Sequence, residues 1–431
     1  MHYLNDSMFR KPFIKCPFCS EVQFGVAIVN GNRYFRRCNN CFRPTGHEKS
    51  YEYTLPPVSK KIIYLDQFAV SNMMKSVKKR KESGTSAADG DYFLELYKKL
   101  DRLTSAQLIL CPSSQAHSSE SVLSKKFEEF KRMYDNLSYG KSFYAFETIE
   151  RFQISKLLRS WNDGKENVEW DFNPEKIMHS TINEWEDSIF ITASEHYMVM
   201  FKPSILERRD NITERLAVVA HRWSGEKGRS FDQWFREEGL AYGPAILKQY
   251  FEHISSMQRI KVGKSPLSIE NLLGSPQTDI VVETYTYLCK NYTSKEALQK
   301  TFEFFDSDVL LDIPFNEIAS LIWAAVARKI SAGQKRMPDG AMDQDIETIS
   351  NLLPYCDALL IDRECHALLS EEPVRTRLEK YNTRVFSASN IREFMDFLDG
   401  IEKGASEEHL KAVEEVYGTD WRDPYLTMYD K

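Results

Sequence analysis

Carboxylates near the ends of short apolar segments are the side chains best placed to do chemistry in this chain. Asp66, Glu120 and Asp362 each follow a segment with the composition of a buried strand, directly or a few residues later. Asp345 lies near the start of an expected helix. Carboxylates held together repel one another unless a proton or a cation neutralises them. If the fold brings these acids together, we expect them to bind Mg²⁺ or Mn²⁺, because these hard cations prefer oxygen ligands.

A carboxylate site with open coordination positions would support hydrolysis of phosphodiester bonds, and the four acids are then the candidate catalytic residues. One ion activates a water molecule and a second, about 4 Å away, stabilises the leaving oxygen. Asp343 lies close to Asp345 and is a further candidate ligand. We expect His117 to be a hydrogen-bonding neighbour of the site rather than a ligand, and we expect Cys356 and Cys365 to be buried.

Each acid also has a purely structural interpretation. Asp345 or Asp343 could cap the helix that begins there. Asp362 could end its strand in a turn, and Glu120 could interact with the dipole of the first turn of its helix. The metal site is favoured because the four acids occur together in this pattern.

Four cysteines form a second group with the spacing of metal ligands. Cys16 and Cys19 make one CxxC pair, Cys38 and Cys41 make another, and eighteen residues separate the pairs. Two strand-like segments around the turn at residues 30–32 lie between them, so the pattern is typical of a zinc ribbon with a closed, structural Zn²⁺ site. A redox pair or chance spacing is the alternative. The basic and aromatic side chains of this segment could contact nucleic acid, face solvent or dock on the next domain.

The elements that must position the acids are short strands. Apolar segments at 61–66, 108–111, 357–361 and 383–387 are each followed by a helical pattern, which predicts a parallel sheet with helices on both faces. All strands of a parallel sheet end at the same edge, where ligands bind. A strongly apolar helix at 313–333 should pack on this sheet.

The chain divides into a small N-terminal unit, a split α/β domain and a helical insertion. Changes in composition and periodicity place the boundaries as follows: zinc ribbon 1–55, α/β domain 60–124 and 311–400, mostly α-helical insertion 125–310, and C-terminal tail 401–431.

Composition narrows the class of protein. The chain has 431 residues, 42% of them hydrophobic, and a mild net charge of −6, so no global basic field indicates nucleic-acid binding. No apolar run approaches the ~20 residues that span a bilayer, and the N-terminus lacks the features of a signal peptide. We therefore expect no membrane association. The chain has eight cysteines, of which four are spaced as metal ligands and four lie in apolar surroundings, so a reducing, cytoplasmic setting fits better than a disulfide framework.

The order of these motifs resembles the PIN-like nuclease fold. The segments that carry the resemblance are IIYLDQFAVSN, LILCPSSQAHSSE, DQDIETI and CDALLIDRE, within residues 61–124 and roughly 310–400. The resemblance implies a three-layer α/β/α domain and a Mg²⁺- or Mn²⁺-dependent nuclease that usually acts on RNA. Its metal-site acids would be Asp66, Glu120, Asp345 and Asp362, with Asp343 nearby. Gln67 stands where a small polar residue is usual, and the insertion is much longer than in a plain PIN domain.

The resemblance leads us to expect an endoribonuclease of the toxin or antiviral-defence type, with RNA favoured over DNA as the substrate. The insertion could bind a protein partner, form a homo-oligomer or cover the active site. The alternative is a non-catalytic zinc-ribbon adaptor or nucleic-acid-binding protein on a PIN-like scaffold, although a scaffold without activity has no reason to keep clustered carboxylates. A phosphatase-type α/β hydrolase fits less well, because Asp66 is not followed by the second aspartate that a phosphoaspartate mechanism needs.

Overall fold

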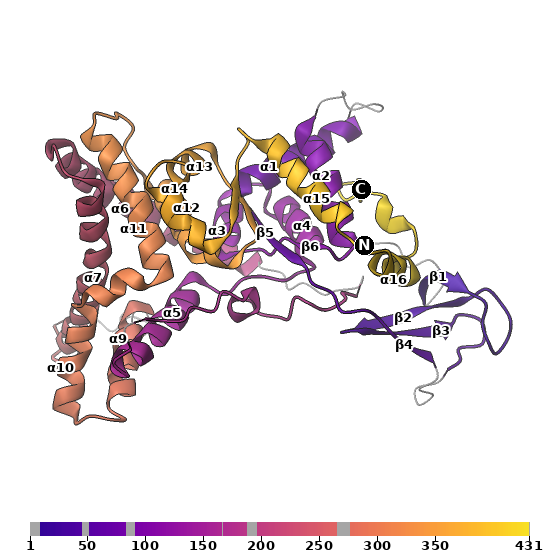
Figure 1. The fold of residues 1–431 in the computed structure, drawn as a ribbon, viewed down its shortest axis with the longest axis horizontal. Helices are drawn as coiled ribbons and strands as arrows, with labels where there is room; N and C mark the ends of the chain where they lie inside the picture. Colours follow the sequence, from indigo (N-terminus) through magenta and orange to yellow (C-terminus); the bar gives the residue numbers. More distant parts are fainter. Residues whose placement is uncertain are drawn as a thin grey trace.

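The structure is a computed structural model that describes residues 9–44, 51–82, 91–165, 167–187, 196–264 and 276–430. Three parts follow one another along the molecule: N-terminal strands at one end, a body of helices around a small sheet, and long helices at the other end (Figure 1). Residues 1–8 lie outside the described ranges. They begin the N-terminal segment that, by its sequence, lacks the features of a signal peptide. Within those ranges, no helix combines the length and the apolar character needed to cross a membrane.

The body contains the parallel sheet that the sequence predicts. Its strands are β5 (Lys61–Leu65), β6 (Ile109–Leu110), β7 (Ala358–Leu360) and β8 (Arg384–Phe386). They lie in the order β6-β5-β7-β8, and each neighbouring pair is parallel. Ile63 pairs with Ala358 and Leu65 pairs with Leu360, so β5 and β7 end side by side.

Helices lie on both faces of this sheet. They are α1 (Gln67–Glu82), α2 (Tyr92–Ser105), α4 (Phe127–Ser138), α11 (Pro314–Ser331), α12 (Gly340–Leu352) and α15 (Ile391–Lys403). Ile62 and Tyr64 of β5 belong to one buried cluster, together with residues of α11 and α12. Ile63 and Leu65 belong to a second cluster, with residues of α1, α2, α4 and α15. Because alternate strand residues point to opposite faces, this division gives three layers: helices, sheet and helices.

Helix α4 extends the body further along the chain than the sequence indicates. Residue 125 was the expected start of the insertion, but Phe130, Met133 and Leu137 of α4 are buried in the same cluster as Ile63 and Leu65. An amphipathic pattern predicts that a helix packs on something without specifying the partner. Three shorter helices complete the body: α3 (Gln115–Leu123), α13 (Arg363–Leu369) and α14 (Val374–Leu378).

Long helices form most of the part between α4 and α11. They are α5 (Phe146–Asn162), α6 (Lys202–Gly225), α7 (Phe231–Lys261), α9 (Pro276–Leu288) and α10 (Ser294–Phe305). Ile154, Ile246 and Phe304 lie in a buried cluster that α5, α7, α9 and α10 share. Ala220 and Trp223 of helix α6 are buried in the cluster that contains residues of α11 and α12. Short 3-10 helices lie at Pro174–Ile177, His196–Phe201, Asp308–Asp312, Leu353–Tyr355, Glu379–Tyr381 and Asp420–Arg422.

The N-terminal part is an antiparallel sheet in the order β1-β2-β3-β4. Its strands are β1 (Arg10–Ile14), β2 (Phe24–Asn30), β3 (Arg33–Cys38) and β4 (Glu52–Thr54). Strands β2 and β3 form the expected hairpin, and Gly31, with φ of 59°, supplies the left-handed conformation that its short turn needs. The outer strands β1 and β4 are too short to show an alternating pattern in the sequence.

The small sheet is docked on the C-terminal helix α16 (Glu407–Tyr417). Val26 and Tyr34 are buried in one cluster with Val413 of α16 and with Trp185. The Arg36 side chain is only 4% exposed and donates hydrogen bonds to the backbone carbonyls of Pro12, Phe24 and Glu415. Tyr34 and Arg36 therefore belong to a docking face, which was one of the open interpretations of this basic and aromatic surface.

Candidate metal centres

The sheet order creates a crevice at the carboxyl ends of β5 and β7. From β5 the chain continues to β6 on one side and later returns to β7 on the other, so the strand order reverses between β5 and β7. In open α/β sheets ligands bind at such a switch point. Asp66 directly follows β5, and Asp362 lies two residues beyond β7. The backbone N–H of Asp66 donates a 2.9 Å hydrogen bond to the Leu360 carbonyl, which fixes the two strand ends together.

Asp66 and Asp362 each use a side-chain oxygen at the start of a helix. Asp66 Oδ1 accepts a 2.6 Å hydrogen bond from the backbone N–H of Gln67. Asp362 Oδ1 accepts bonds of 2.6 and 3.0 Å from the backbone N–H groups of Glu364 and Cys365, so Asp362 caps α13. The structural interpretation of Asp362 was a turn at the end of its strand, whereas its Oδ1 atom in fact caps α13, and these bonds leave Oδ2 for other contacts.

Asp345 is not a helix cap. The cap of α12 is Asp339, whose Oδ1 accepts bonds of 3.0 Å from the backbone N–H groups of Ala341 and Met342. Asp343 lies in the first turn of α12, and Asp345 lies further along the helix. The interpretation of Asp345 or of Asp343 as the cap is therefore wrong, and the half-buried position of Asp345 among other acids needs another explanation.

The electrostatic interactions of the acids show that four of them form one cluster. The pKa of Asp345 is raised to about 9 by burial and by the charges of Asp66, Asp362 and Glu120, with Arg209 opposing the shift. Burial raises the pKa of Asp66 to about 7, and the charge of Asp362 contributes. The pKa of Glu120 is also raised to about 7, by burial and by Asp66, again against Arg209. The structure thus brings together Asp66, Glu120, Asp345 and Asp362, here named the acid cluster.

Part of this cluster has ligand atoms close enough together to be compatible with a metal ion. One carboxylate oxygen of Asp345, one of Asp362 and the Sγ atom of Cys365 all lie within 4.8 Å of one another. Among the described residues, none of the four acids is in an ion pair with a lysine, arginine or histidine, so no protein cation neutralises them by direct contact. The donor set consists mainly of carboxylate oxygens, which suits a hard divalent ion.

Glu120 and His117 lie on α3, one turn apart, and connect it to the rest of the site. Gln344 Nε2 donates a 3.2 Å hydrogen bond to Glu120 Oε1, which links α3 to α12. His117 is buried, and its ring is stacked between the rings of Tyr64 and Tyr134. Its Nδ1 atom accepts a bond from the Ser114 N–H, and burial lowers its pKa to about 4. His117 is therefore a neutral hydrogen-bonding neighbour of the site.

Asp343 belongs to a different group of acids. Burial raises its pKa, and Arg208 opposes this shift. It interacts with Glu347 on the same helix, and Glu347 in turn interacts with Glu150 on α5. Asp343 therefore lies on another side of α12 from Asp345, and the structure does not bring it into the acid cluster.

Sequence reasoning missed three residues at the acid cluster. Cys365 follows Asp362 by one helical turn, so spacing alone could have indicated it. Gln344 lies between the two aspartates of the DQD motif and could have been noticed for the same reason. Arg209 lies on α6, far away in the sequence, and no local pattern indicates that it approaches Glu120 and Asp345.

The four N-terminal cysteines meet as the spacing predicts, and together they are here named the four-cysteine cluster. Their Sγ atoms all lie within 4.8 Å of one another. The distance from Cys16 Sγ to Cys41 Sγ is 3.7 Å, and that from Cys19 Sγ to Cys38 Sγ is also 3.7 Å. Tetrahedral zinc with Zn–S bonds of about 2.3 Å requires sulfur atoms about 3.8 Å apart.

Hydrogen bonds reach the sulfur atoms at this site. The backbone N–H groups of Phe18 and Asn40 each point at a cysteine Sγ, at 3.4 Å. A backbone hydrogen bond at Glu21 and the Asn40 side chain lower the pKa of Cys19 to about 6. A backbone hydrogen bond at Arg43 lowers the pKa of Cys41, but burial and the other three cysteines outweigh it and raise that pKa to about 11, so the thiols share protons when no metal is bound. A four-cysteine cluster with this geometry is compatible with a structural zinc ion.

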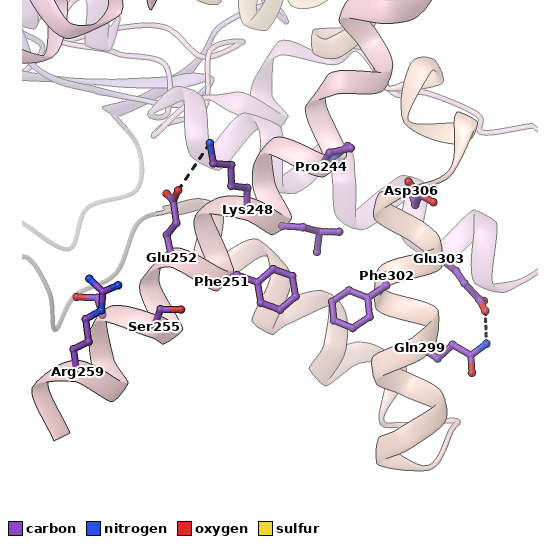
Figure 2. Close-up of a pocket in the computed structure, with 12 residues that line it drawn as sticks. Pro244, Lys248, Phe251, Glu252, Ser255, Arg259, Gln299, Phe302, Glu303 and Asp306 are labelled. Carbon is purple, nitrogen blue, oxygen red and sulfur yellow. Dashed lines mark hydrogen bonds and ion pairs between the residues drawn. The ribbon is translucent and has the colours of Figure 1, made fainter. Parts of the chain in front are cut away.

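An apolar groove lies away from both centres, between α7 and α10 (Figure 2). Phe251 of α7 and Phe302 of α10 face each other across it, with ring centroids 5.8 Å apart. No residue of the acid cluster or of the four-cysteine cluster lines the groove. It is therefore not part of either candidate metal centre.

Comparison with known proteins finds no matching family model, no matching curated protein and no matching solved structure.

Proposed function

We propose that the acid cluster binds Mg²⁺ or Mn²⁺ and that the protein is a metal-dependent, PIN-like nuclease. The observation that carries this proposal is the position of Asp345, whose pKa is raised to about 9 by burial and by three other carboxylates. These acids come from four separate segments and meet at the switch point of the sheet. Burying like charges together is unfavourable unless protons or a bound cation neutralise them, and a cation that binds here would displace the protons. Groups with such shifted pKa values cluster at functional sites.

The residues of the acid cluster have distinct roles in this proposal. When bound, the divalent ions would activate water and stabilise the leaving oxygen of a phosphodiester. Asp345 and Asp362, whose oxygens are already close, would hold a first ion together with Asp66. Glu120, oriented by Gln344, would complete the cluster on the side of α3. In this proposal the four acids bind the metal ions, and residues outside the acid cluster orient the substrate.

The type of nuclease follows from the resemblance to PIN-like domains, which usually act on RNA. We propose an endoribonuclease of the toxin or antiviral-defence type. The four-cysteine cluster would hold structural zinc in a ribbon that α16 fixes to the body. The eight free cysteines, several of them buried, favour a reducing compartment such as the cytoplasm.

The test is cleavage of labelled single-stranded RNA and DNA by the full chain with Mn²⁺, Mg²⁺ or EDTA. Wild type is compared with Asp345→Asn and with Asp343→Asn, a matched change on the same helix outside the acid cluster. We expect cutting that requires the metal, is lost in Asp345→Asn and is largely retained in Asp343→Asn. Cutting that survives Asp345→Asn would place the site elsewhere. A folded, zinc-loaded protein that cuts neither substrate would favour the non-catalytic adaptor.

A further inference from the structure

Helix α6 of the helical part is fixed to the start of α12, the helix that carries Asp345. The backbone N–H of Gly340 donates a 2.9 Å hydrogen bond to Thr213 Oγ1, and this hydroxyl donates a 2.9 Å bond to the Arg209 carbonyl. The two backbones are so close that a Cβ at Gly340 would lie 2.5 Å from the Arg209 oxygen. Any larger residue at position 340 would push the helices apart.

The same helix is also fixed to α3, the helix that carries Glu120. At the start of α6, Lys202 Nζ donates a 3.0 Å hydrogen bond to the carbonyl of Leu123, the last residue of α3. Further along, Ala220 and Trp223 are buried in the cluster shared with α11 and α12. Helix α6 is therefore held against both helices that supply acids from outside the strand ends.

These contacts bring one arginine to the acid cluster. The charge of Arg209 lowers the pKa of both Glu120 and Asp345, whereas neighbouring Arg208 acts on Asp343 and Glu347. The Arg208 guanidinium lies 3.9 Å from Glu347 Oε1. Arg209 is half-buried and, within the described parts of the chain, makes no ion pair with any carboxylate. A Cβ at Gly340 would also lie 2.8 Å from Arg209 Cγ, so the base of this side chain lies at the start of α12, and its charge acts on Glu120 and Asp345 without an ion pair among the described residues.

We propose that Arg209 binds the phosphate group of the nucleic-acid substrate at the acid cluster, so that the helical part completes the active site. This role rests on the proposed nuclease function. Once metal ions neutralise these carboxylates, no carboxylate among the described residues is paired with Arg209, and its charge is available to a phosphate. Guanidinium is planar and can donate two parallel hydrogen bonds to phosphate oxygens. A local cation is needed because the whole chain carries a net charge of −6 and would otherwise repel a polyanion.

The experiment uses Arg209→Gln, which keeps most of the side chain's length and removes its charge. The matched control is Arg208→Gln, one position away on the same helix. Binding of fluorescein-labelled single-stranded RNA is measured with Ca²⁺, cleavage is measured with Mn²⁺, and Mn²⁺ affinity is measured calorimetrically without RNA. We expect Arg209→Gln to lower RNA affinity and kcat/KM by roughly 10- to 100-fold. Mn²⁺ affinity should stay the same or rise, because a positive charge near the ion is removed.

Two results would overturn the role of Arg209. One is equal behaviour of Arg209→Gln and Arg208→Gln in RNA binding and cleavage. The other is a loss of Mn²⁺ affinity in Arg209→Gln, since that would mean the arginine only positions the acids. If wild type binds RNA through Arg209 but does not cut with any ion, the nuclease proposal fails while the phosphate-binding role remains. The two failures are therefore distinguishable.

Discussion

The imidazole of His117 donates a 2.7 Å hydrogen bond from Nε2 to the backbone carbonyl of Leu65, the residue directly before Asp66. His117 also lies one turn before Glu120 on α3. One side chain therefore fixes the distance between the end of β5 and the helix that carries Glu120. Because Nδ1 accepts from the Ser114 N–H, the ring is held in the tautomer that can donate to Leu65.

We expect His117→Ala to weaken both the fold and the metal site. The change leaves a buried backbone carbonyl and a buried N–H without partners, which costs about 1–3 kcal/mol for each unsatisfied group. Denaturant unfolding measures the loss of stability, and calorimetry measures the loss of Mn²⁺ affinity. His409→Ala is the matched control, because His409 Nε2 is also 2.7 Å from a backbone carbonyl, that of Ala106, away from the acids. Equal Mn²⁺ affinities in the two variants would contradict a positioning role for His117.

Metal binding should depend strongly on pH. Without metal, Asp345 has a pKa of about 9, and Asp66 and Glu120 have pKa values of about 7. A cation must displace the protons that these groups hold, so Mn²⁺ affinity is expected to rise from pH 6 to pH 9. Calorimetry in buffers with different ionisation enthalpies should detect protons released on binding. Affinity that stays constant over this range would mean that the acids are already ionised and far apart.

The same pKa values predict how the free energy of unfolding of the metal-free protein changes with pH. A carboxyl group whose pKa is higher in the folded than in the unfolded state holds its proton more tightly when the protein is folded. The folded state is therefore destabilised relative to the unfolded state as pH rises from about 4 towards 9 and this proton is lost. Asp345→Asn removes this effect. At pH 8 without metal we expect the variant to be more stable than wild type by about 0.5–2 kcal/mol, as is common when functional charge clusters are relieved.

The gain in Asp345→Asn should shrink at pH 5, where Asp345 is protonated in the folded wild type. Asp339→Asn is the control, because asparagine caps a helix as well as aspartate does and position 339 is outside the acid cluster. Thermal unfolding at the two pH values gives the comparison. An Asp345→Asn protein that is less stable than wild type at pH 8 would show that Asp345 contributes to the fold.

The sheet was predictable from the sequence because its two central strands, β5 and β7, are buried on both sides. Ile62 and Ile63 point to opposite faces and both are fully buried, which requires an unbroken apolar segment that local reading detects. Because these apolar segments mark where the strands end, the sequence also predicted that Asp66 and Asp362 lie just beyond them. The cap of α12 was not, because Asp339, Asp343 and Asp345 are equally suitable by residue type, and only the backbone geometry selects Asp339.

Local sequence patterns could not predict which elements far apart in the sequence pack against one another. The periodicity of α4 indicates an apolar face, but nothing in residues 127–138 indicates that this face packs with β5. Likewise, Arg209 reaches the acid cluster through the contact of Gly340 with Thr213, two residues that lie far apart in the sequence. These relationships depend on how complete helices pack.

The four-cysteine cluster should bind one zinc ion that holds the N-terminal sheet together. We expect Cys38→Ser to lose this ion, because structural sites need all four ligands. The segment around Cys16 and Phe24 has little other core, so it should become sensitive to proteolysis. Zinc content by mass spectrometry and limited proteolysis give the readout, with exposed Cys289→Ser as the control. Full zinc content in Cys38→Ser would contradict the assignment.

Cys365 should decide how the acid cluster responds to soft metals. Its thiol lies against Asp345 and Asp362, and burial and these two charges raise its pKa above the usual range in the metal-free protein, which makes it a poor ligand for Mg²⁺ or Mn²⁺. Cysteine is a preferred ligand of Cd²⁺ but not of Mn²⁺. We therefore expect Cys365→Ser to keep the Mn²⁺ affinity of wild type and to bind one Cd²⁺ fewer, as measured by sulfur-to-cadmium absorbance. Cys356→Ser, another buried cysteine, should keep the wild-type number. Loss of Mn²⁺ affinity in Cys365→Ser alone would mean that the thiol, and not only the carboxylates, binds the catalytic ion.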